Sequence, residues 1–239
     1  MQIAIMQPTY LPWIGYFKLM SIVDIFVFLD DIQFDKRSWQ QRNKISSKML
    51  DFYLLTMPVV SKGLFNQKLN EVKIVDSENS IKKHLDIIYH EYSKSPFFVQ
   101  NFEEIEYIYQ QNDSNLCNLN IKFIEYFKKK LNINTKTILS SQLEINSKKE
   151  TKLFEICKVI NTSTYISPIG SLNYLRNTDI FCKNKINVKM FNYEPKIYKN
   201  FRNKNCSHLS FLDVLFNFGN SSKKVMNEGK LLLKPLTEF

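Results

Sequence analysis

Glycine is scarce in this chain, with five among 239 residues. Neither of the glycine-rich phosphate loops, GxGxxG or GxxxxGK followed by Ser or Thr, occurs, so a nucleotide phosphate must be bound by other groups. Cysteine is also sparse, and its four positions are too scattered for a zinc site, which uses pairs about two to four residues apart. We expect reduced thiols; a nucleophilic cysteine placed beside a histidine by the fold stays open. The residues concerned are Cys117, Cys157, Cys182 and Cys206, with His84, His90 and His208.

Long apolar segments and export signals are absent too. No run of about 18 or more uncharged apolar residues occurs, so no segment is expected to span a membrane. The N-terminus has neither the basic region nor the small-residue cleavage site of a signal peptide. We therefore expect a cytoplasmic protein, and its 239 residues suit one large domain or one domain with an embellishment.

Basic residues outnumber acidic ones by 33 to 23, which gives a net charge of +10. The excess lies mainly after residue 100, where 21 basic residues accompany 13 acidic ones, compared with 12 and 10 before it. A basic half attracts polyanions such as nucleic acid, an acidic membrane surface or the diphosphate of a nucleotide-linked substrate. A lysine-rich composition that only aids solubility explains the charge equally well.

Short apolar runs alternate with segments of helical periodicity along the chain. The first three, strand, helix and strand, make a βαβ unit, whose crossover is nearly always right-handed. Strands are predicted at 2–6, 25–29, 52–58, 71–75, 135–139, 164–167 and 186–192, with 52–58 and 71–75 forming an edge pair or meander. Helices are predicted at 13–23, 80–92, 101–131 with a break near 112–115, 149–160, 171–176 and 209–217.

This alternation predicts an α/β fold, which we take to be a Rossmann-like three-layer domain with a mainly parallel sheet and a helical embellishment. We assign residues 1–220 to this single domain and expect residues 221–239 to form a loose, basic C-terminal tail. In such folds ligands bind beyond the carboxyl ends of the strands. Polar residues directly after a strand are therefore the first candidates for a site.

The first strand is followed by QPTYLPW. Its two prolines fix φ and remove backbone donors, so the loop is stiff where it enters the helix. A stiff loop lets Gln7 hold one orientation toward a ligand, while Tyr10 and Trp13 offer ring faces on which a base or sugar could stack. The alternative is a packed loop in which the aromatic rings belong to the core.

The second strand ends at Asp30 and Asp31, with Gln33 close behind. Adjacent carboxylates are costly to desolvate unless they are hydrogen-bonded or bound to a metal. One of them could hold Mg²⁺ on a nucleotide diphosphate or act as a base on an attacking amine, and the alternative is a solvated turn. Because neighbouring strand residues point to opposite faces, at most one of the two should face a site.

The segment KRSWQQRNKI follows, and it supplies Trp39, Arg42 and Asn43 as candidates. A guanidinium group binds phosphate with two parallel hydrogen bonds, and an indole can cover a base. A basic loop in a protein of this charge is as often merely solvated, so both interpretations stay open.

The later candidates lie on separate elements. His84 is on a predicted helix and is a candidate base, although a lone helical histidine is more often structural. Tyr165 lies in a strand and Tyr198 follows one, and both are candidates for substrate contact. Asp213 stands near a helix start three residues after Ser210, a spacing that also fits a capping box.

These segments together resemble the WbqC-like family. The likeness rests on QPTYLPWIGYF, DIFVFLDDIQF, WQQRNKI and HLSFLDVLFNFG, and it runs over roughly residues 2–220. One departure lies at Pro168, which interrupts what is usually Ser-Gly after the tyrosine strand. The family is associated with bacterial O-antigen, lipopolysaccharide and related polysaccharide gene clusters, and a glycine-transferase role has been proposed for some members.

The resemblance implies an enzyme that transfers a glycyl, other aminoacyl or acyl group to the amine of a nucleotide-linked amino sugar. Asp30, Asp31 or His84 would supply the base, and the remaining candidates would bind substrate. The donor is open: glycine activated by ATP with Mg²⁺, or an aminoacyl-tRNA, which would make tRNA a partner. Two other classes are retained, a non-enzymatic sugar- or nucleotide-binding assembly protein and a nucleic-acid binder whose affinity falls steeply with salt.

Overall fold

The central element of the computed structural model, which describes residues 1–111 and 113–238, is a six-stranded sheet with the order β10-β7-β6-β1-β2-β5. All neighbours pair in parallel except β10, which runs antiparallel to β7 at one edge. The strands are β1 (Gln2–Met6), β2 (Ile25–Phe28), β5 (Lys136–Leu139), β6 (Thr164–Pro168), β7 (Asn187–Glu194) and β10 (Lys230–Pro235). The predicted α/β class with a mainly parallel sheet is confirmed.

Alternate residues of the parallel strands supply two separate hydrophobic cores, one on each face of the sheet. Ile3 and Ile5 of β1 pack in one core, whereas Ala4 between them packs in the other. Val27 and Phe26 of β2 divide in the same way. A parallel sheet covered on both faces requires such continuous apolar runs, which is why the strand residues read as uninterrupted apolar segments.

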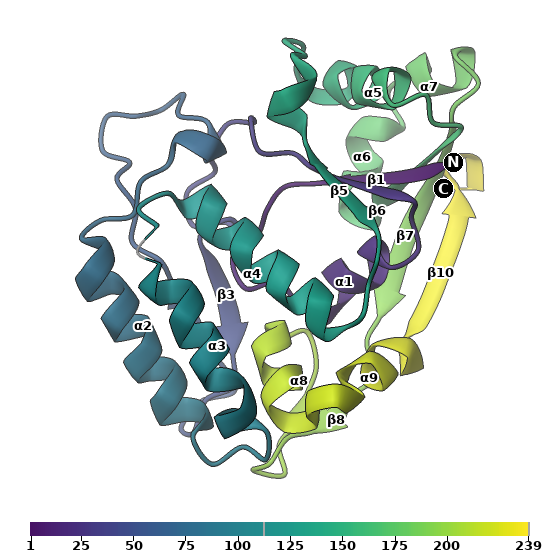
Figure 1. Cartoon of the computed structure of the whole chain (residues 1–239). Coiled ribbons are helices and arrows are strands. Elements are labelled where there is room, and N and C mark those ends of the chain that lie inside the picture. The colour runs from purple at the N-terminus through teal and green to yellow at the C-terminus, as the bar shows by residue number, and fades with distance from the viewer. Residues whose placement is uncertain (112, 239) are drawn as a thin grey trace.

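Helices cover both faces and complete the three layers (Figure 1). The first face carries α1 (Ile14–Met20), α4 (Leu116–Lys130), α8 (Phe211–Phe218) and α9 (Ser222–Glu228). The opposite face carries α5 (Lys149–Val159), α6 (Leu172–Leu175) and α7 (Ile180–Lys183). In chain order the parallel strands lie 3-2-1-4-5, so the winding direction reverses beside β1, as in doubly wound dinucleotide-binding folds.

The helical embellishment lies between β2 and β5. It contains α2 (Ser77–Tyr92) and α3 (Phe98–Gln110), with the antiparallel hairpin of β3 (Arg42–Ile45) and β4 (Tyr53–Thr56). Figure 1 shows α2 and α3 side by side, away from the central sheet. Both helices add buried side chains to the core of the first face. The predicted break in helix 101–131 falls between α3 and α4, and its first residue, Asn112, lies outside the described residues.

Two expectations for the embellishment were wrong. Residues 42–45, predicted as a basic loop, form β3 because Asn43 and Ile45 are buried while the basic side chains between them point outward. Residues 71–75 do not pair with β4, whose partner is β3; this stretch makes only isolated bridges, Val59 with Ile74 and Lys73 with Asn115. The remaining short elements are η1 (Leu69–Glu71), η2 (Ser140–Leu143), η3 (Ile169–Ser171), β8 (Tyr198–Lys199), β9 (Asn205–Cys206), η4 (Gly219–Ser221) and η5 (Leu236–Glu238).

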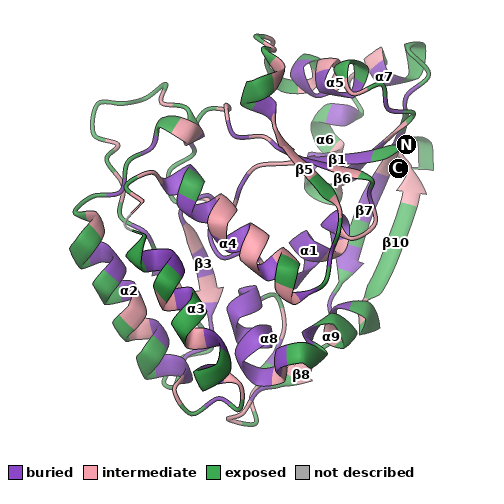
Figure 2. Ribbon diagram, viewed as in Figure 1, coloured by how far each residue is buried: buried purple, intermediate pink, exposed green. Residues whose placement is uncertain are grey.

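The C-terminal segment is part of the fold, and its expected looseness was wrong. Helix α9 buries Met226 in the first core, and the Tyr193 hydroxyl of β7 donates to the Met226 carbonyl at 2.8 Å. Strand β10 then pairs with β7 along its whole length. The expectation was wrong because lysines flank the apolar run Leu231–Leu233 and make the segment basic on average. Figure 2 shows β10 mainly exposed beside the buried β7, as an edge strand must be.

Among residues 1–111 and 113–238, no helix has both the length and the apolar character needed to cross a bilayer.

Candidate functional site

A groove of about 1040 Å³ lies beyond the carboxyl ends of β2 and β5. Three stretches of chain line it: residues 31–33 after β2, the region around η1, and the segment from η2 into the start of α5. This is the edge at which parallel sheets bind ligands. Among the predicted site residues, the groove includes Asp31 and Gln33.

Asp30 is buried and does not line the groove. Its Oδ1 accepts from the backbone N–H of Ser141 at 2.9 Å, and its Oδ2 accepts from the Ser141 hydroxyl at 2.6 Å. Asn70 donates to Oδ2 at 3.4 Å, and the Ser140 hydroxyl lies 3.0 Å from Oδ1. Asp30 therefore holds the turn after β5 against the end of β2 and has no carboxylate oxygen free for a substrate.

Asp31 faces the groove and forms an ion pair. Its Oδ2 lies 2.6 Å from Nζ of Lys152, and its Oδ1 accepts from the Ser140 hydroxyl at 2.5 Å. Burial alone would raise the pKa of this carboxyl, but the hydrogen bonds from Lys152 and Ser140 hold the pKa below its usual value. Asp31 is therefore a stable carboxylate. One aspartate faces the groove and its neighbour faces the interior, as strand geometry predicted.

Four of the residues that line the groove are lysines. Besides Lys152, which is nearly buried, Lys68, Lys148 and Lys149 line it, and none of these three has a carboxylate partner within the part of the chain that is described. Helix α5 begins at Lys149 without a side-chain cap, so its first N–H groups add positive potential there. Unpaired cations at the end of a parallel sheet suit an anionic ligand.

Gln7 shares an edge of the sheet with Asp31 but does not line the groove. The edge is shared because β1 and β2 pair in parallel, and the Leu29 N–H donates to the Met6 carbonyl at 2.8 Å. The Gln7 side-chain oxygen accepts from the amide of Gln40. Gln7 and Asp31 therefore follow neighbouring parallel strands but do not line one pocket.

The loop QPTYLPW and the segment WQQRN bind to each other. Asn43 donates to the carbonyls of Tyr10 and Leu11 at 3.1 and 2.9 Å, and the Tyr10 N–H donates to the Trp39 carbonyl at 2.9 Å. Asn43 is buried, so its predicted contact with substrate is not available. The two motifs stiffen the first loop by mutual hydrogen bonds, which explains their joint presence without a ligand.

Tyr10 and His84 form a buried hydrogen-bonded chain with Tyr109. The Tyr10 hydroxyl lies 2.6 Å from Nδ1 of His84 and also contacts the Tyr109 hydroxyl. His84 Nε2 lies 3.0 Å from the Thr56 carbonyl, which can only accept, so Nε2 carries the proton and Nδ1 accepts from Tyr10. Burial lowers the pKa of His84 to about 4. The structure thus contradicts a stacking role for Tyr10, and both ring nitrogens of His84 are occupied away from the groove.

Trp13 packs at the start of α1 and does not line the groove. Its ring stacks on His208 at a centroid distance of 5.2 Å and tilts against Tyr193. A Cβ on Gly15 would lie 2.3 Å from the same ring, so glycine leaves the space that the indole occupies. Trp39 is half-exposed and Arg42 is half-buried, and neither lines the groove. Their roles in binding stay predictions.

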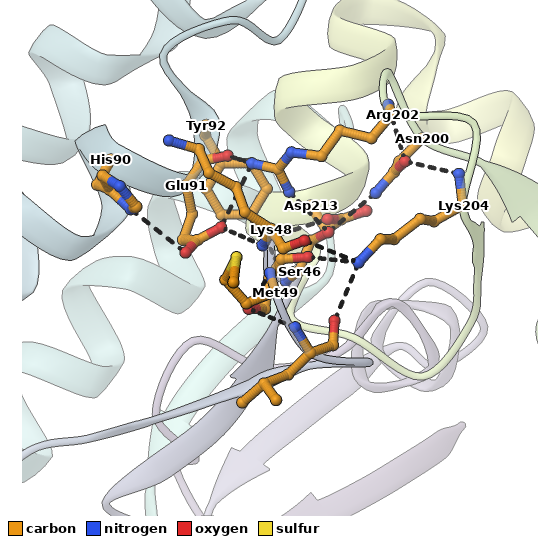
Figure 3. Close-up of polar contacts among 12 residues, drawn as sticks. Ser46, Lys48, Met49, His90, Glu91, Tyr92, Asn200, Arg202, Lys204 and Asp213 are labelled. Atoms are coloured by element: carbon orange, nitrogen blue, oxygen red, sulfur yellow. Dashed lines mark hydrogen bonds and ion pairs between the residues drawn. The ribbon is translucent and has the colours of Figure 1, made fainter.

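Asp213 belongs to a second polar cluster, drawn in Figure 3, and does not line the groove. Its carboxylate accepts from the Tyr198 hydroxyl at 2.6 Å and from the Tyr92 hydroxyl at 3.0 Å. Burial raises the pKa of Asp213 to about 6, although both tyrosines and Arg202 oppose that rise. Ser210 caps α8 through the Leu212 N–H, and Asp213 turns to the tyrosines, so the capping box does not form.

The same cluster ties the turn between β8 and β9 to the loop after β3. Arg202 donates to the Ser46 hydroxyl at 3.3 Å and to the backbone carbonyl of Glu91. Lys204 donates to the carbonyls of Ser47 and Leu50 at 2.9 and 3.1 Å. Every polar group here serves a structural contact. Tyr198 and Asp213 are therefore placed as structural residues, contrary to their predicted contact with substrate.

Tyr165 is also buried, stacked on Phe181, and its hydroxyl accepts from Ser167 at 2.9 Å. It contacts the core of the second face, so its predicted role in the site is contradicted. Burial also keeps three of the four cysteines from acting as nucleophiles, because it raises the pKa of Cys117, Cys157 and Cys206 to about 12. Cys182 is exposed, and all four thiols are free.

Sequence reasoning missed three residues of the groove edge. Ser140 and Ser141 directly follow β5, so the rule that identified Asp31 applies to them as well. Lys152 had no local signal, because a lysine within an amphipathic helix is normally solvated. Within the described ranges, no group of three or more histidine, cysteine, aspartate or glutamate side chains could hold a metal ion.

Comparison with known proteins agrees with the motifs. The model of the WbqC-like protein family matches residues 7–225. The chain belongs to the WbqC-like protein family. It is 31% identical over 220 residues to the Mycobacterium tuberculosis (strain ATCC 25618 / H37Rv) protein named "Uncharacterized protein Rv1507c", covering 91% of this chain and 94% of that one. No solved structure matches the chain significantly.

Proposed function

We propose that this WbqC-like protein is an enzyme that transfers a glycyl, other aminoacyl or acyl group to the amine of a nucleotide-linked amino-deoxy sugar. The pathway would be the cytoplasmic stage of O-antigen or another surface polysaccharide. The observation that carries the proposal is the groove at the ends of β2 and β5, where unpaired lysines surround the Asp31–Lys152 ion pair. The glycine-transferase role proposed for some members of the family supports this reaction class, and the groove offers a place for it.

The acceptor's diphosphate accounts for the lysines. Lys68, Lys148 and Lys149 are free to neutralise phosphate oxygens, and the start of α5 offers further N–H donors. A volume of about 1040 Å³ is at the upper end of the usual range of small-molecule sites, which suits a sugar nucleotide. The amino sugar would then lie toward Asp31, deeper at the strand ends.

The reaction needs a neutral amine and a stabilised oxyanion. The amine nitrogen attacks the carbonyl carbon of the activated acyl donor, a C–N bond forms, and the bond from that carbon to the donor oxygen breaks. The nitrogen's proton passes to Asp31 or to water, and the leaving oxygen takes up a proton from solvent. Asp31 attracts the amino group through its charge, and the Lys152 ammonium stabilises negative charge on the carbonyl oxygen.

Two activated donors fit the chemistry. An aminoacyl-tRNA is an ester and would meet the basic surface of the chain, whereas free glycine would first need ATP. Mg²⁺ in such sites is usually bound by the nucleotide phosphates together with one or two carboxylates. Asp31 is the carboxylate at the groove edge that would bind it. ATP with Mg²⁺ would supply the activated acyl group; the residues described above bind and orient the acceptor.

The test is mass spectrometry of UDP-, dTDP- and GDP-linked amino sugars incubated with the protein. Glycine with ATP and Mg²⁺ is one arm, and glycyl-tRNA is the other. A sugar nucleotide heavier by one glycyl residue in either arm supports the proposal and identifies the donor. Asp31→Asn should then lower the rate by about 100-fold or more. The matched control is Asp86→Asn on the exposed face of α2, which should leave the rate unchanged.

A non-enzymatic sugar-nucleotide-binding protein is the second candidate. The observation that favours it is the low pKa of Asp31, since a carboxylate already paired with Lys152 is a weak base. This candidate requires that sugar nucleotides bind but are recovered unchanged in both arms. It also requires that Asp31→Asn preserve polysaccharide production in the cell.

A further inference from the structure

A second hollow of about 470 Å³ adjoins the lysine-lined groove. It is formed by the loop of residues 63–67 together with Glu71, and it shares Asn66 and Glu71 with the groove. The two hollows are therefore neighbours on the surface. They differ in chemistry, because the groove is rich in lysine and the loop carries apolar side chains, Leu64 and Phe65.

Phe65 is the most exposed phenylalanine in the described ranges, with 83% of its surface accessible. An exposed ring this large leaves apolar surface in water that burial would remove. The backbone of the loop is held in place: the Gln33 side chain donates to the Phe65 carbonyl at 2.8 Å, and the Phe34 N–H donates to the Gln67 carbonyl at 2.8 Å. Gln33 itself lines the groove, so the backbone at Phe65 is tied to the groove wall.

We propose that residues 63–67 form the nucleoside subsite and that Phe65 stacks on the base of the bound nucleotide. This inference rests on the proposed function, because it takes the groove to hold a diphosphate. With the phosphates on Lys68, Lys148 and Lys149, the nucleoside extends into the adjoining hollow, where Phe65 supplies a ring face. Base stacking on an exposed aromatic ring tolerates every base, so Phe65 secures nucleotides as a class.

The Gln67 side chain is a second observation in the same hollow. Its amide nitrogen donates to the Glu71 carbonyl at 3.1 Å, but its side-chain oxygen is buried without a hydrogen-bond partner. A buried acceptor left unpaired is costly. Phe65 thus provides the stacking surface, and the Gln67 side chain lines the same hollow.

The experiment compares the affinity of the full-length protein for UDP, GDP and inorganic pyrophosphate by isothermal titration calorimetry. Pyrophosphate reports the lysines alone, whereas the nucleoside diphosphates report the lysines and the loop together. Phe65→Ala should weaken UDP and GDP binding by about tenfold, the loss expected for one stacked base, and change pyrophosphate binding by less than about twofold. Phe65→Trp should restore nucleotide affinity.

Two control variants separate the subsites. Val99→Ala alters an equally exposed apolar side chain on α3, outside both hollows, and should change none of the three affinities. The double variant Lys148→Ala with Lys149→Ala should weaken all three ligands together, because each of them carries phosphate.

The outcomes distinguish the two proposals. If Phe65→Ala leaves the ratio of UDP to pyrophosphate affinity unchanged, the nucleoside subsite is wrong while the groove still binds phosphate; Phe65 then belongs to a protein contact. If the unaltered protein binds neither pyrophosphate nor either nucleoside diphosphate, the groove is not a phosphate site, and the proposed function fails together with this inference.

Discussion

Asp31 and Asp213 are both largely shielded carboxylates that accept short hydrogen bonds, yet their environments shift the pKa in opposite directions. At the groove, the Lys152 ammonium and the Ser140 hydroxyl outweigh burial and lower the pKa of Asp31. On α8, Asp213 accepts from two neutral tyrosine hydroxyls, and burial raises its pKa to about 6. A formal positive charge in contact makes the difference, since hydroxyl groups compensate lost hydration only in part.

The comparison separates a site from a structural network. The groove keeps an ion pair and unpaired lysines next to open volume, so its charges are available to a ligand. The interior around His84 and Asp213 has the residue types of an active site, but their hydrogen-bonding groups are occupied by tyrosines, amides and carbonyls. Residue type alone therefore did not locate the candidate site. What distinguishes the groove is that some of its charged side chains have no carboxylate partner in the described part of the chain.

Removing the cation from the groove should have the largest effect on stability. Lys152→Met leaves Asp31 shielded from water and unpaired, and loss of one partner of a largely buried ion pair costs about 3 kcal/mol or more in the free energy of unfolding. Urea denaturation measures this change. The control is Lys183→Met, which breaks an exposed ion pair with Asp179 at the start of α7 and should leave the urea midpoint nearly unchanged. Equal losses in the two variants would show that the Asp31 pair behaves as a surface pair.

His84 should make the protein less stable in acid. Its pKa is about 4 in the folded state and near 6.5 when exposed. Between these values the unfolded chain binds the extra proton, so stability present above pH 6.5 is lost as the pH falls toward 4, by up to about 3 kcal/mol. His84→Gln should abolish this dependence. The measurement is the free energy of unfolding at pH 7, 5.5 and 4.5, and an unchanged difference between pH 7 and 4.5 in His84→Gln would contradict the assignment.

Asp213 should change the pH dependence of stability in the opposite direction to His84 and by a slightly smaller amount. Its carboxyl takes up a proton near pH 6 when folded and near 3.8 when unfolded, so the folded state binds more protons in between. The stability it contributes is complete below about pH 4 and is lost as the pH rises through 6, by about 2 to 3 kcal/mol. Asp213→Asn should remove this dependence.

The groups facing Asp213 are Tyr92, Tyr198, Asn217 and Arg202, and Arg202 is the cation among them. Because the slopes of His84 and Asp213 oppose each other over the same pH range, the unaltered protein should show a shallow profile. Asp213→Asn should therefore expose the acid sensitivity due to His84, and a steeper loss of stability below pH 6 in this variant is the expected sign. If the dependence of stability on pH stays shallow in Asp213→Asn, the two residues do not have opposing effects.

The parallel strands of the sheet could be predicted from local patterns, and so could the fact that at most one of the two aspartates faces a site, although not which one. Buried parallel strands are short apolar runs, and Asp31 follows one of them with Asp30 pointing the other way. Strand β3 was missed because its half-buried basic residues, Arg42 and Lys44, make up half of its four residues. An alternating strand on the edge of an embellishment carries no continuous apolar signal.

The partners of Asp31 could not be predicted, because the fold brings them from 109 and 121 residues away. Pairing of β2 with β5 places Ser140 beside the carboxylate, and the turn into α5 then brings Lys152. Burial of Tyr10 and His84 was equally beyond local patterns, since it depends on how α2, α3 and α4 pack against the first loop. A motif reports which residues are retained together, and long-range packing decides whether they face a ligand or each other.

The smallest expected effect concerns Asp213, whose closest hydrogen-bond donors are neutral tyrosine hydroxyls. Tyr198→Phe removes one hydroxyl that donates to Asp213 at 2.6 Å while keeping the ring that packs on Phe218. Loss of one such hydrogen bond should cost about 1 to 2 kcal/mol at pH 7, where Asp213 is charged. It should cost less at pH 5, because a protonated carboxyl needs the donor less.

The same hydroxyl helps to hold the pKa of Asp213 down, so Asp213 in the variant should also titrate at higher pH, as followed by the chemical shift of its carboxyl carbon in NMR. A cost that is the same at both pH values would mean that Asp213 keeps one protonation state between pH 5 and pH 7, which would contradict a pKa near 6.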